Sequence, residues 1–279
     1  MVSANSCLPW LCFVRRPVVY SGVGRLYVGT SGWVYKGWAR TFYPADLPLA
    51  RQFAFYSTQF PSVEINNTFY RLPTEGAVRK WREQAPEGFI YAVKGSRFIT
   101  HMKKLNVSSE SIAIFFERVA PLREHLGPIL WQLPPHLKKD AERLESFLRQ
   151  LPKHFHYAME FRHPSWLDNA IFALLRKFQI AHVSLSSMAM PRDLTITADF
   201  LYLRFHGLAG GAAHDYTTAE LIPWARHCRS ALRKGMSVYA YFNNDWNTRA
   251  PKNALEFIKL VEAPGRRRSP LQKPLQLLQ

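Results

Sequence analysis

The sequence predicts one α/β domain in which eight parallel strands alternate with helices and close into a barrel. Eight strand-like runs occur between residues 26 and 243, amphipathic helical patterns separate most of them, and polar side chains stand at the ends of the runs. Parallel strands buried on both faces are almost wholly apolar, so polar ends need an explanation. In a TIM-like (β/α)8 barrel, that end is where ligands bind.

The predicted strands are short runs rich in β-branched and aromatic residues. They are Leu26–Ser31, Ser62–Asn66, Phe89–Lys94, Ile129–Leu133, Tyr157–Arg162, Ala181–Leu185, Leu201–His206 and Val238–Asn243. Eight such repeats within about 240 residues match a closed barrel in number and in size.

The segments between these strands carry apolar residues at helical spacing. The predicted helices are Ala50–Gln59, Thr74–Gln84, Ser108–Leu126, Leu137–Leu151, Trp166–Phe178, Thr218–Lys234 and Pro251–Val261. Pro121 is expected to kink or split the third helix. Thr218 is a candidate cap for the sixth helix, and Gly235 ends it. The segment Ser186–Asp199 shows no helical pattern.

The alternative is an open, doubly wound sheet, in which a glycine-rich phosphate-binding turn is expected after the first strand. The run Gly29-Thr30-Ser31-Gly32 lacks the spacing of that fingerprint. The closed barrel is therefore favoured.

Side-chain alternation along a strand predicts which residues face the barrel axis. In Tyr157–Arg162, the large apolar residues share one side, while Glu160 and Arg162 share the other. In Leu201–His206, Arg204 and His206 likewise share a side. The apolar sets are expected to face the helices, which directs the charged sets into one cavity.

The chain of 279 residues is 47% hydrophobic and 14% aromatic, which indicates a globular domain. We predict a barrel domain at 25–262, a disordered extension at 1–24 and a disordered basic, proline-rich tail at 263–279. No apolar run is long enough to span a bilayer, and the apolar run Cys7–Val14 precedes its arginines, which is the reverse of a secretory signal. Three cysteines without zinc-ligand spacing favour a reducing, cytoplasmic setting.

The formal net charge is +17. Three arginines before the first predicted strand and four basic residues after the last helix account for seven of these charges, which leaves +10 on the central body. Such a field attracts polyanions without specific contacts. An arginine-biased host proteome, or cations on solvated faces, would explain the same charge.

Six motifs, in order along residues 26–262, resemble the YecE-like family, a bacterial and archaeal domain of unknown function. They are Gly29-Thr30-Ser31-Gly32-Trp33, Val63-Glu64-Ile65-Asn66-Asn67-Thr68-Phe69-Tyr70-Arg71, Gln132-Leu133-Pro134-Pro135, Glu160-Phe161-Arg162-His163-Pro164-Ser165-Trp166, Arg204-Phe205-His206-Gly207 and Tyr241-Phe242-Asn243-Asn244-Asp245. The resemblance implies a TIM-like barrel but supplies no reaction. One departure follows Asp245: the family usually has a small residue near Asn247-Thr248, where this chain is bulkier.

Glu64 and Glu160 are the candidate acid–base pair, and His206 is a candidate general base or proton carrier. A glycosidase would place two such carboxyl groups about 5–9.5 Å apart. The alternative is that each glutamate only neutralises an arginine, because buried charges need partners.

Lys94, Arg162 and Arg204 are candidates for an anion clamp, because arginine forks suit phosphate or carboxylate groups. A self-compensated network of ion pairs would use the same side chains without a ligand. Lys94 could also form a Schiff base if its pKa is depressed, although anion binding is the simpler explanation.

Other polar and aromatic residues near the strand ends are candidate substrate contacts. They are Gln132, Asn243, Asn244, Asp245, His101 and Tyr70. Asparagines also stabilise tight turns, and the aromatic residues around Tyr70 either stack on ligand rings or cover the top of the core.

No cofactor is predicted. A divalent metal held by His101, His206 and the carboxylates is the weaker alternative, because the neighbouring cations would repel it and no local ligand motif occurs. The expected partner is an anionic small molecule or nucleic acid; no membrane is expected, and the oligomeric state stays open.

The leading interpretation is an enzyme that hydrolyses, or otherwise transforms, a phosphorylated substrate such as a phosphate ester, a sugar phosphate or nucleic acid. The alternatives are a non-catalytic nucleic-acid-binding barrel and a metal-free glycoside-processing barrel. The second of these requires the two carboxyl groups to face each other without an interposed arginine.

Overall fold

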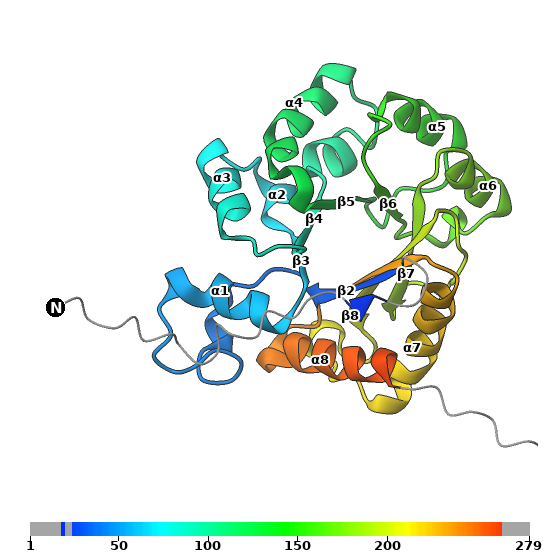
Figure 1. The fold of residues 1–279 in the computed structure, drawn as a ribbon. Helices are drawn as coiled ribbons and strands as arrows, with labels where there is room; N and C mark the ends of the chain where they lie inside the picture. The colour runs from blue at the N-terminus through cyan, green and yellow to red at the C-terminus, as the bar shows by residue number, and fades with distance from the viewer. Residues whose placement is uncertain (1–17, 20–23, 264–279) are drawn as a thin grey trace, which may run out of the picture.

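The structure, a computed structural model, describes residues 18–19 and 24–263, and these form a ring of strands enclosed by helices (Figure 1). The strands are β1 Val18–Val19, β2 Arg25–Thr30, β3 Ser62–Ile65, β4 Ile90–Lys94, β5 Leu126–Gln132, β6 Tyr157–Glu160, β7 Ala181–Ser187, β8 Phe200–Gly207 and β9 Ser237–Phe242. From β2 to β9 they correspond to the eight predicted strands, so the TIM-like (β/α)8 barrel is confirmed.

The barrel is nearly closed. The strand order is β1-β2-β9-β8-β7-β6-β5-β4-β3, with parallel pairing throughout except between β1 and β2. The barrel closes between β2 and β3, which meet through a parallel bridge between Ser31 and Glu64. Gly29 permits this approach, because a Cβ at that position would lie 2.0 Å from the carbonyl oxygen of Ser62.

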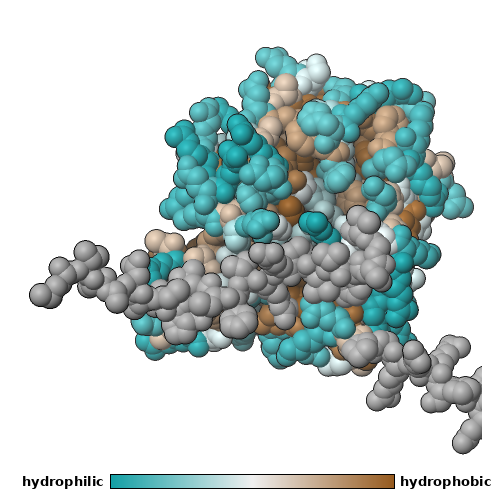
Figure 2. Space-filling view, in the orientation of Figure 1, coloured by the Kyte–Doolittle hydropathy of each residue, from teal (hydrophilic) through white to brown (hydrophobic). Residues whose placement is uncertain are grey.

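The expected alternation of inward and outward side chains is confirmed. Tyr157, Met159 and Phe161 pack into the large core between strands and helices, whereas Ala158 belongs to a smaller cluster inside the barrel. On β8, Leu203 likewise packs into the large core between strands and helices rather than into the inside of the barrel. Hydrophilic residues cover most of the outer helices on the face seen in Figure 2, and hydrophobic residues show between them.

Helices follow most of the strands and cover the outside of the barrel (Figure 1). They are α1 Leu49–Gln59, α2 Asn67–Tyr70, α3 Glu75–Gln84, α4 Ser109–Val119, α5 Ala141–Gln150, α6 Asn169–Lys177, α7 Thr218–Arg233 and α8 Arg249–Glu262. The predicted helix 108–126 is split: α4 ends at Val119, and a 3-10 turn, Ala120–His125, follows at Pro121. The segment between β7 and β8 has no helix, as expected.

The predicted start of α5 and the predicted cap of α7 were wrong, because side-chain hydrogen bonds decide where a helix begins. Helix α5 begins at Ala141 rather than at Leu137, since the carboxylate of Asp140 accepts the backbone N–H of Arg143 at 3.0 Å. Helix α7 is capped by Thr217 rather than Thr218, in a capping box with Glu220.

The predicted extensions lie mostly outside the described residues. Where the structure does describe them, Val18–Val19 pairs with β2 as a short antiparallel strand, so disorder was the wrong expectation for these two residues. Within the described part of the chain, no helix combines the length and the apolarity needed to cross a membrane.

Candidate functional site at the barrel mouth

The carboxyl ends of the strands bring most of the predicted site residues to one mouth. We call these the mouth residues: Glu64, Lys94, Gln132, Glu160, Arg162, Arg204, His206 and Asn243. They lie on the inward face of their strands or directly after it. For this reason Glu64 and Arg204, which are 140 positions apart in the sequence, meet here.

Arg204 is the centre of the mouth. Its side chain is 1% exposed, and it donates from Nη2 to Oε1 of Glu64 at 2.7 Å and from Nη1 to Oε2 of Glu160 at 2.5 Å. Both carboxylates are fully buried. A guanidinium therefore lies between the two glutamates, and the condition for the glycoside-processing alternative is not met.

Glu64 is held on both oxygens. Oε1 also accepts from the hydroxyl of Ser31 at 2.7 Å, and Oε2 accepts from the hydroxyl of Tyr202 at 2.7 Å. Burial raises the pKa of Glu64, but the charge and hydrogen bond of Arg204 outweigh it, so the pKa lies below its ordinary value. Ser31 and Tyr202 were not predicted, although Tyr202 has the same strand parity as Arg204.

Glu160 forms ion pairs with two arginines, Arg204 and Arg162. Its second oxygen accepts from Nε of Arg162, whose side chain is 18% exposed. Burial raises the pKa of Glu160, and the guanidinium groups of Arg162 and Arg204 more than reverse this, leaving the pKa well below its usual range. A carboxylate of this kind is a poor proton acceptor, so the geometry favours a positioning role for both glutamates over the predicted acid–base role.

His206 is a neutral acceptor in the mouth. Its Nε2 lies 2.8 Å from Nη2 of Arg162 and 3.0 Å from Nη1 of Arg204. Both guanidinium groups can only donate, so Nε2 carries the lone pair that accepts from them, and the amide nitrogen Nδ2 of Asn243 lies 3.0 Å from Nδ1. Burial and the charge of Arg204 lower the pKa of His206 to about 4.

Lys94 differs from the two arginines because, among the described residues, it forms no ion pair. Its ammonium lies 4.2 Å from the ring centroid of Phe69. Burial and the charge of Arg204 lower the pKa of Lys94 to about 8, although Glu160 and Glu64 act in the opposite direction. Part of the cationic charge at the mouth is therefore left without a partner.

The remaining predicted residues occupy different positions. Gln132 accepts weakly from Arg204 at 3.4 Å. His101 stands against the ring of Phe69 at 4.8 Å, at the edge of the mouth. Asp245 accepts from the indole N–H of Trp38 at 2.7 Å, and burial raises its pKa to about 6.

Asn244 and Tyr70 lie outside the mouth. Asn244 is fully buried, and its amide donates to Oδ1 of Asn253 and to the carbonyl of His214, both at 2.8 Å. It therefore stabilises the loop after β9 rather than facing a ligand. Tyr70 is 72% exposed on the outer rim.

The residues at which the chain departs from the family pattern have an unusual backbone conformation. Asn247 and Thr248 both have positive φ, at 53° and 60°, a region that favours small residues without a branched Cβ. Thr248 is held there by hydrogen bonds to the carbonyl of Gly37 and to the hydroxyl of Thr41, both at 2.8 Å.

No group of three or more histidine, cysteine, aspartate or glutamate side chains among residues 18–19 and 24–263 is arranged to hold a metal ion. In the mouth, arginine nitrogens already occupy carboxylate oxygens that a metal would require.

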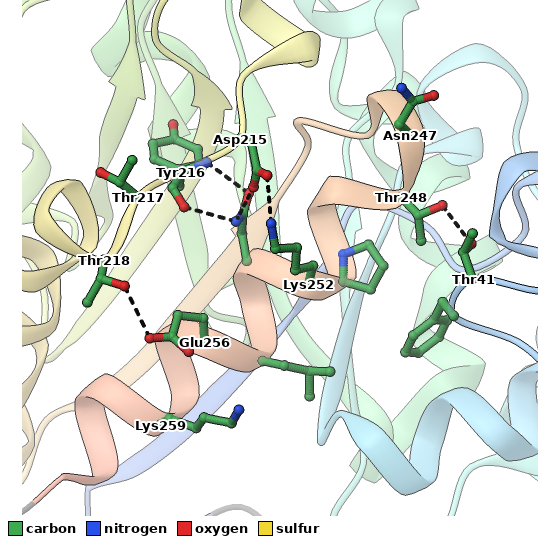
Figure 3. A pocket seen from close by; sticks show the side chains of 14 residues that line it. Thr41, Asp215, Tyr216, Thr217, Thr218, Asn247, Thr248, Lys252, Glu256 and Lys259 are labelled. Atoms are coloured by element: carbon green, nitrogen blue, oxygen red, sulfur yellow. Dashed lines mark hydrogen bonds and ion pairs between the residues drawn. The ribbon is translucent and has the colours of Figure 1, made fainter.

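A separate cavity of about 940 Å³ lies outside the barrel, between α8 and the loops that precede α7 and follow β2 (Figure 3). Its prominent charged groups are paired: Lys252 contacts Asp215 at 2.6 Å, and Asn253 donates to the same carboxylate at 2.9 Å. The mouth residues do not line it. Its polar groups therefore join α8 to the start of α7, and the mouth remains the candidate site.

The fold and the mouth define a class of protein: a single TIM-like barrel with a buried glutamate–arginine network at the carboxyl ends of its strands. The chain belongs to the family described as protein of unknown function DUF72, whose pattern matches residues 27–276. The YecE-like resemblance is thus confirmed.

Relatives and solved structures agree with this assignment. UPF0759 protein YecE of Escherichia coli strain K12 is 30% identical over 142 residues, which is about half of each chain. UPF0759 protein YunF of Bacillus subtilis strain 168 is 25% identical over 85% of this chain and 95% of its own. A DUF72 family crystal structure from Thermotoga maritima matches with a TM-score of 0.78 and 28% identity, over 85% of this chain and 99% of that one.

Proposed function

We propose that this protein is an enzyme that acts on an anionic, phosphorylated substrate whose phosphate is held at the barrel mouth. One observation carries the proposal: the ammonium of Lys94 is largely buried beside two arginines, and it lacks the carboxylate partner that both arginines have. Removing a charge from water without a partner is unfavourable. A bound anion would relieve that cost.

The charges around His101 support an anion site on the same side of the mouth. Burial, followed by the electrostatic effect of Lys94, His136, Arg97 and Arg162, lowers the pKa of His101 to about 4. These groups come from the ends of β4, β5 and β6, which are neighbours in the sheet. A phosphate among them would meet several donors and a positive field.

Two groups near the mouth have pKa values moved towards neutrality, which is typical of residues that transfer protons. They are Lys94 at about 8 and Asp245 at about 6. We assign anion binding and proton donation to Lys94, proton acceptance to Asp245, and the positioning of both arginines to Glu64 and Glu160.

Replacing Lys94 with methionine is expected to weaken phosphate binding by about 10- to 100-fold, the loss of one charge-assisted contact. The same change should raise the free energy of unfolding by about 1–3 kcal/mol at pH 7, because the pKa shift of Lys94 from 10.5 to about 8 reports that its charged form is disfavoured in the fold. Calorimetric titration with phosphate and urea denaturation measure the two effects. Unchanged phosphate affinity in Lys94→Met would contradict the proposal.

The pH dependence of anion binding should follow Lys94. Sulfate is the suitable probe because it does not titrate in this range. Its affinity should be nearly constant between pH 6.5 and 7.5 and should fall about tenfold per pH unit above about 8, where the ammonium loses its proton. In Lys94→Met this break should disappear. A wild-type break near pH 10.5 instead would show that Lys94 is not perturbed.

Turnover distinguishes an enzyme from the alternative, a non-catalytic nucleic-acid-binding barrel. Wild-type protein screened against phosphodiesters, phosphomonoesters and glycosides should act on a phosphate ester, and Asp245→Asn should slow turnover at least tenfold while leaving phosphate affinity within a few-fold. If no substrate is turned over while polyanion binding survives in Asp245→Asn and Glu160→Gln, the binding module is the better description.

A further inference from the structure

One sector of the rim combines exposed apolar side chains with unpaired cations. It consists of α2 Asn67–Tyr70 with the residue after it and the loop after β4, which contains a π-helical turn, Phe98–Met102. We call this the β3–β4 rim. Turns of this kind are rare and are often found at functional sites.

The two segments of the β3–β4 rim are in contact. The ring of Phe69 lies 5.0 Å from the ring of Tyr70 and 4.8 Å from that of His101. The same ring is in contact with the ammonium of Lys94 at 4.2 Å, so the rim adjoins the mouth directly. The hydroxyl of Thr68 donates to the carbonyl of Lys94 at 2.7 Å and fixes α2 against β4.

The β3–β4 rim is positively charged throughout. Residues 65–74 and 88–109 contain neither aspartate nor glutamate. They contain Arg71, Arg97, Lys103 and Lys104, in addition to Lys94, and the first three are exposed. Among the described residues, none of these four rim cations forms a salt bridge, in contrast to the paired Lys139, Arg143 and Lys177 elsewhere.

Large apolar side chains stand among these cations. Tyr70 is 72% exposed, Met102 is 62% exposed and Phe98 is 39% exposed. The ammonium of Lys103 lies 5.7 Å from the ring of Phe98. Exposed rings between cations are the arrangement with which proteins stack unpaired bases while tracking a phosphate backbone.

We propose that the β3–β4 rim binds single-stranded nucleic acid, with bases on Tyr70 and Phe98 and phosphates on Arg71, Arg97 and Lys103. The assignment rests on the proposed function, since the next phosphate along the strand would be the one that Lys94 holds in the mouth. It names the substrate class of the enzyme as a nucleotide chain with unstacked bases.

The charge and shape of the rim favour a strand over other occupants. A second copy of this chain would bring the same cations face to face and would be repelled. A membrane-surface anchor uses an amphipathic helix with a continuous apolar face, whereas the apolar residues here stand on a four-residue helix and a five-residue π turn.

The test is fluorescence anisotropy of a labelled single-stranded oligonucleotide of about ten nucleotides, compared with an abasic oligomer of the same length. Wild-type protein should bind the oligonucleotide at least fivefold more tightly than the abasic oligomer. Tyr70→Ala and Phe98→Ala should each remove most of this preference, and Ile114→Ala, an exposed apolar residue on α4, should leave it unchanged.

The charge component is measured by salt dependence. The double variant Arg97→Ala/Lys103→Ala should lower the slope of log affinity against log salt by about 1.4, because each phosphate contact on a single strand contributes about 0.7. Arg79→Ala on the exposed side of α3 is the control and should leave the slope within experimental error.

The outcomes separate this inference from the proposed function. If sulfate binding depends on Lys94 but the oligonucleotide binds no more tightly than the abasic oligomer, the rim assignment is wrong and the mouth proposal stands. If wild-type protein and all rim variants bind the oligonucleotide with the same affinity, the rim assignment is also wrong. Binding to anionic lipid vesicles that is lost in Tyr70→Ala, without oligonucleotide binding, would identify a membrane surface instead.

Discussion

Arg204→Met is expected to lower the free energy of unfolding by about 3–5 kcal/mol at pH 7. The methionine nearly fills the space of the arginine stem, but it leaves Glu64 and Glu160 fully buried. Within the described part of the chain, Glu64 then loses its only arginine partner, and Glu160 keeps only Arg162. Urea denaturation followed by circular dichroism measures the change.

The pH dependence of this effect has a definite sign. In the wild-type protein the pKa values of Glu64 and Glu160 lie below 4.5, so their ion pairs stabilise the fold above that pH and lose this contribution as the pH falls. Without Arg204, burial raises the pKa of Glu64, and protonation then becomes favourable in the fold. The difference between wild type and variant should therefore narrow from pH 7 to pH 4.5.

A surface arginine provides the control. Arg143 lies 3.1 Å from the carboxylate of Asp140, and both are partly exposed. Arg143→Met should change the free energy of unfolding by about 0–1 kcal/mol. If Arg204→Met is no more destabilising than this, the glutamates are not held as the structure describes.

Gly29→Ala is expected to destabilise the fold by about 2–4 kcal/mol, at the upper end for an overpacked core. The added Cβ would lie 2.0 Å from the carbonyl oxygen of Ser62 and 2.8 Å from the hydroxyl of Tyr56. The closest of these atoms belongs to the backbone of β3, so β2 must move away from β3 at the point where the barrel closes. Thermal unfolding with calorimetry measures the loss.

Gly76→Ala is the matched control. Gly76 lies in α3, and an added Cβ there would meet no atom within 4 Å. Alanine forms helices more readily than glycine, so this variant should be more stable by about 0.5–1 kcal/mol. A Gly29→Ala variant as stable as wild type would mean that β2 and β3 do not approach as closely as described.

The sequence alone determined the barrel and the direction of its side chains. Strand-like runs alternated with helical patterns, and the period of two along Tyr157–Arg162 placed Glu160 on the inner face. Pro121 marked the end of α4 because a proline cannot continue the hydrogen-bond ladder of a helix. These features depend on residues that are close together in the sequence, so they can be recognised before the fold is known.

Only the tertiary structure decided which charged side chains form ion pairs with one another. Glu64 and Arg204 lie 140 residues apart, and their pairing depends on the closing of the barrel between β2 and β3. Positions at strand ends, together with strand parity for Glu160, Arg162 and Arg204, predicted that Glu64, Glu160 and three cations share a cavity. They could not indicate that Arg204 would bond both glutamates and leave Lys94 without an ion pair among the described residues. Distances of a few ångströms between side chains decide that outcome, and they are set by register and closure rather than by residue order.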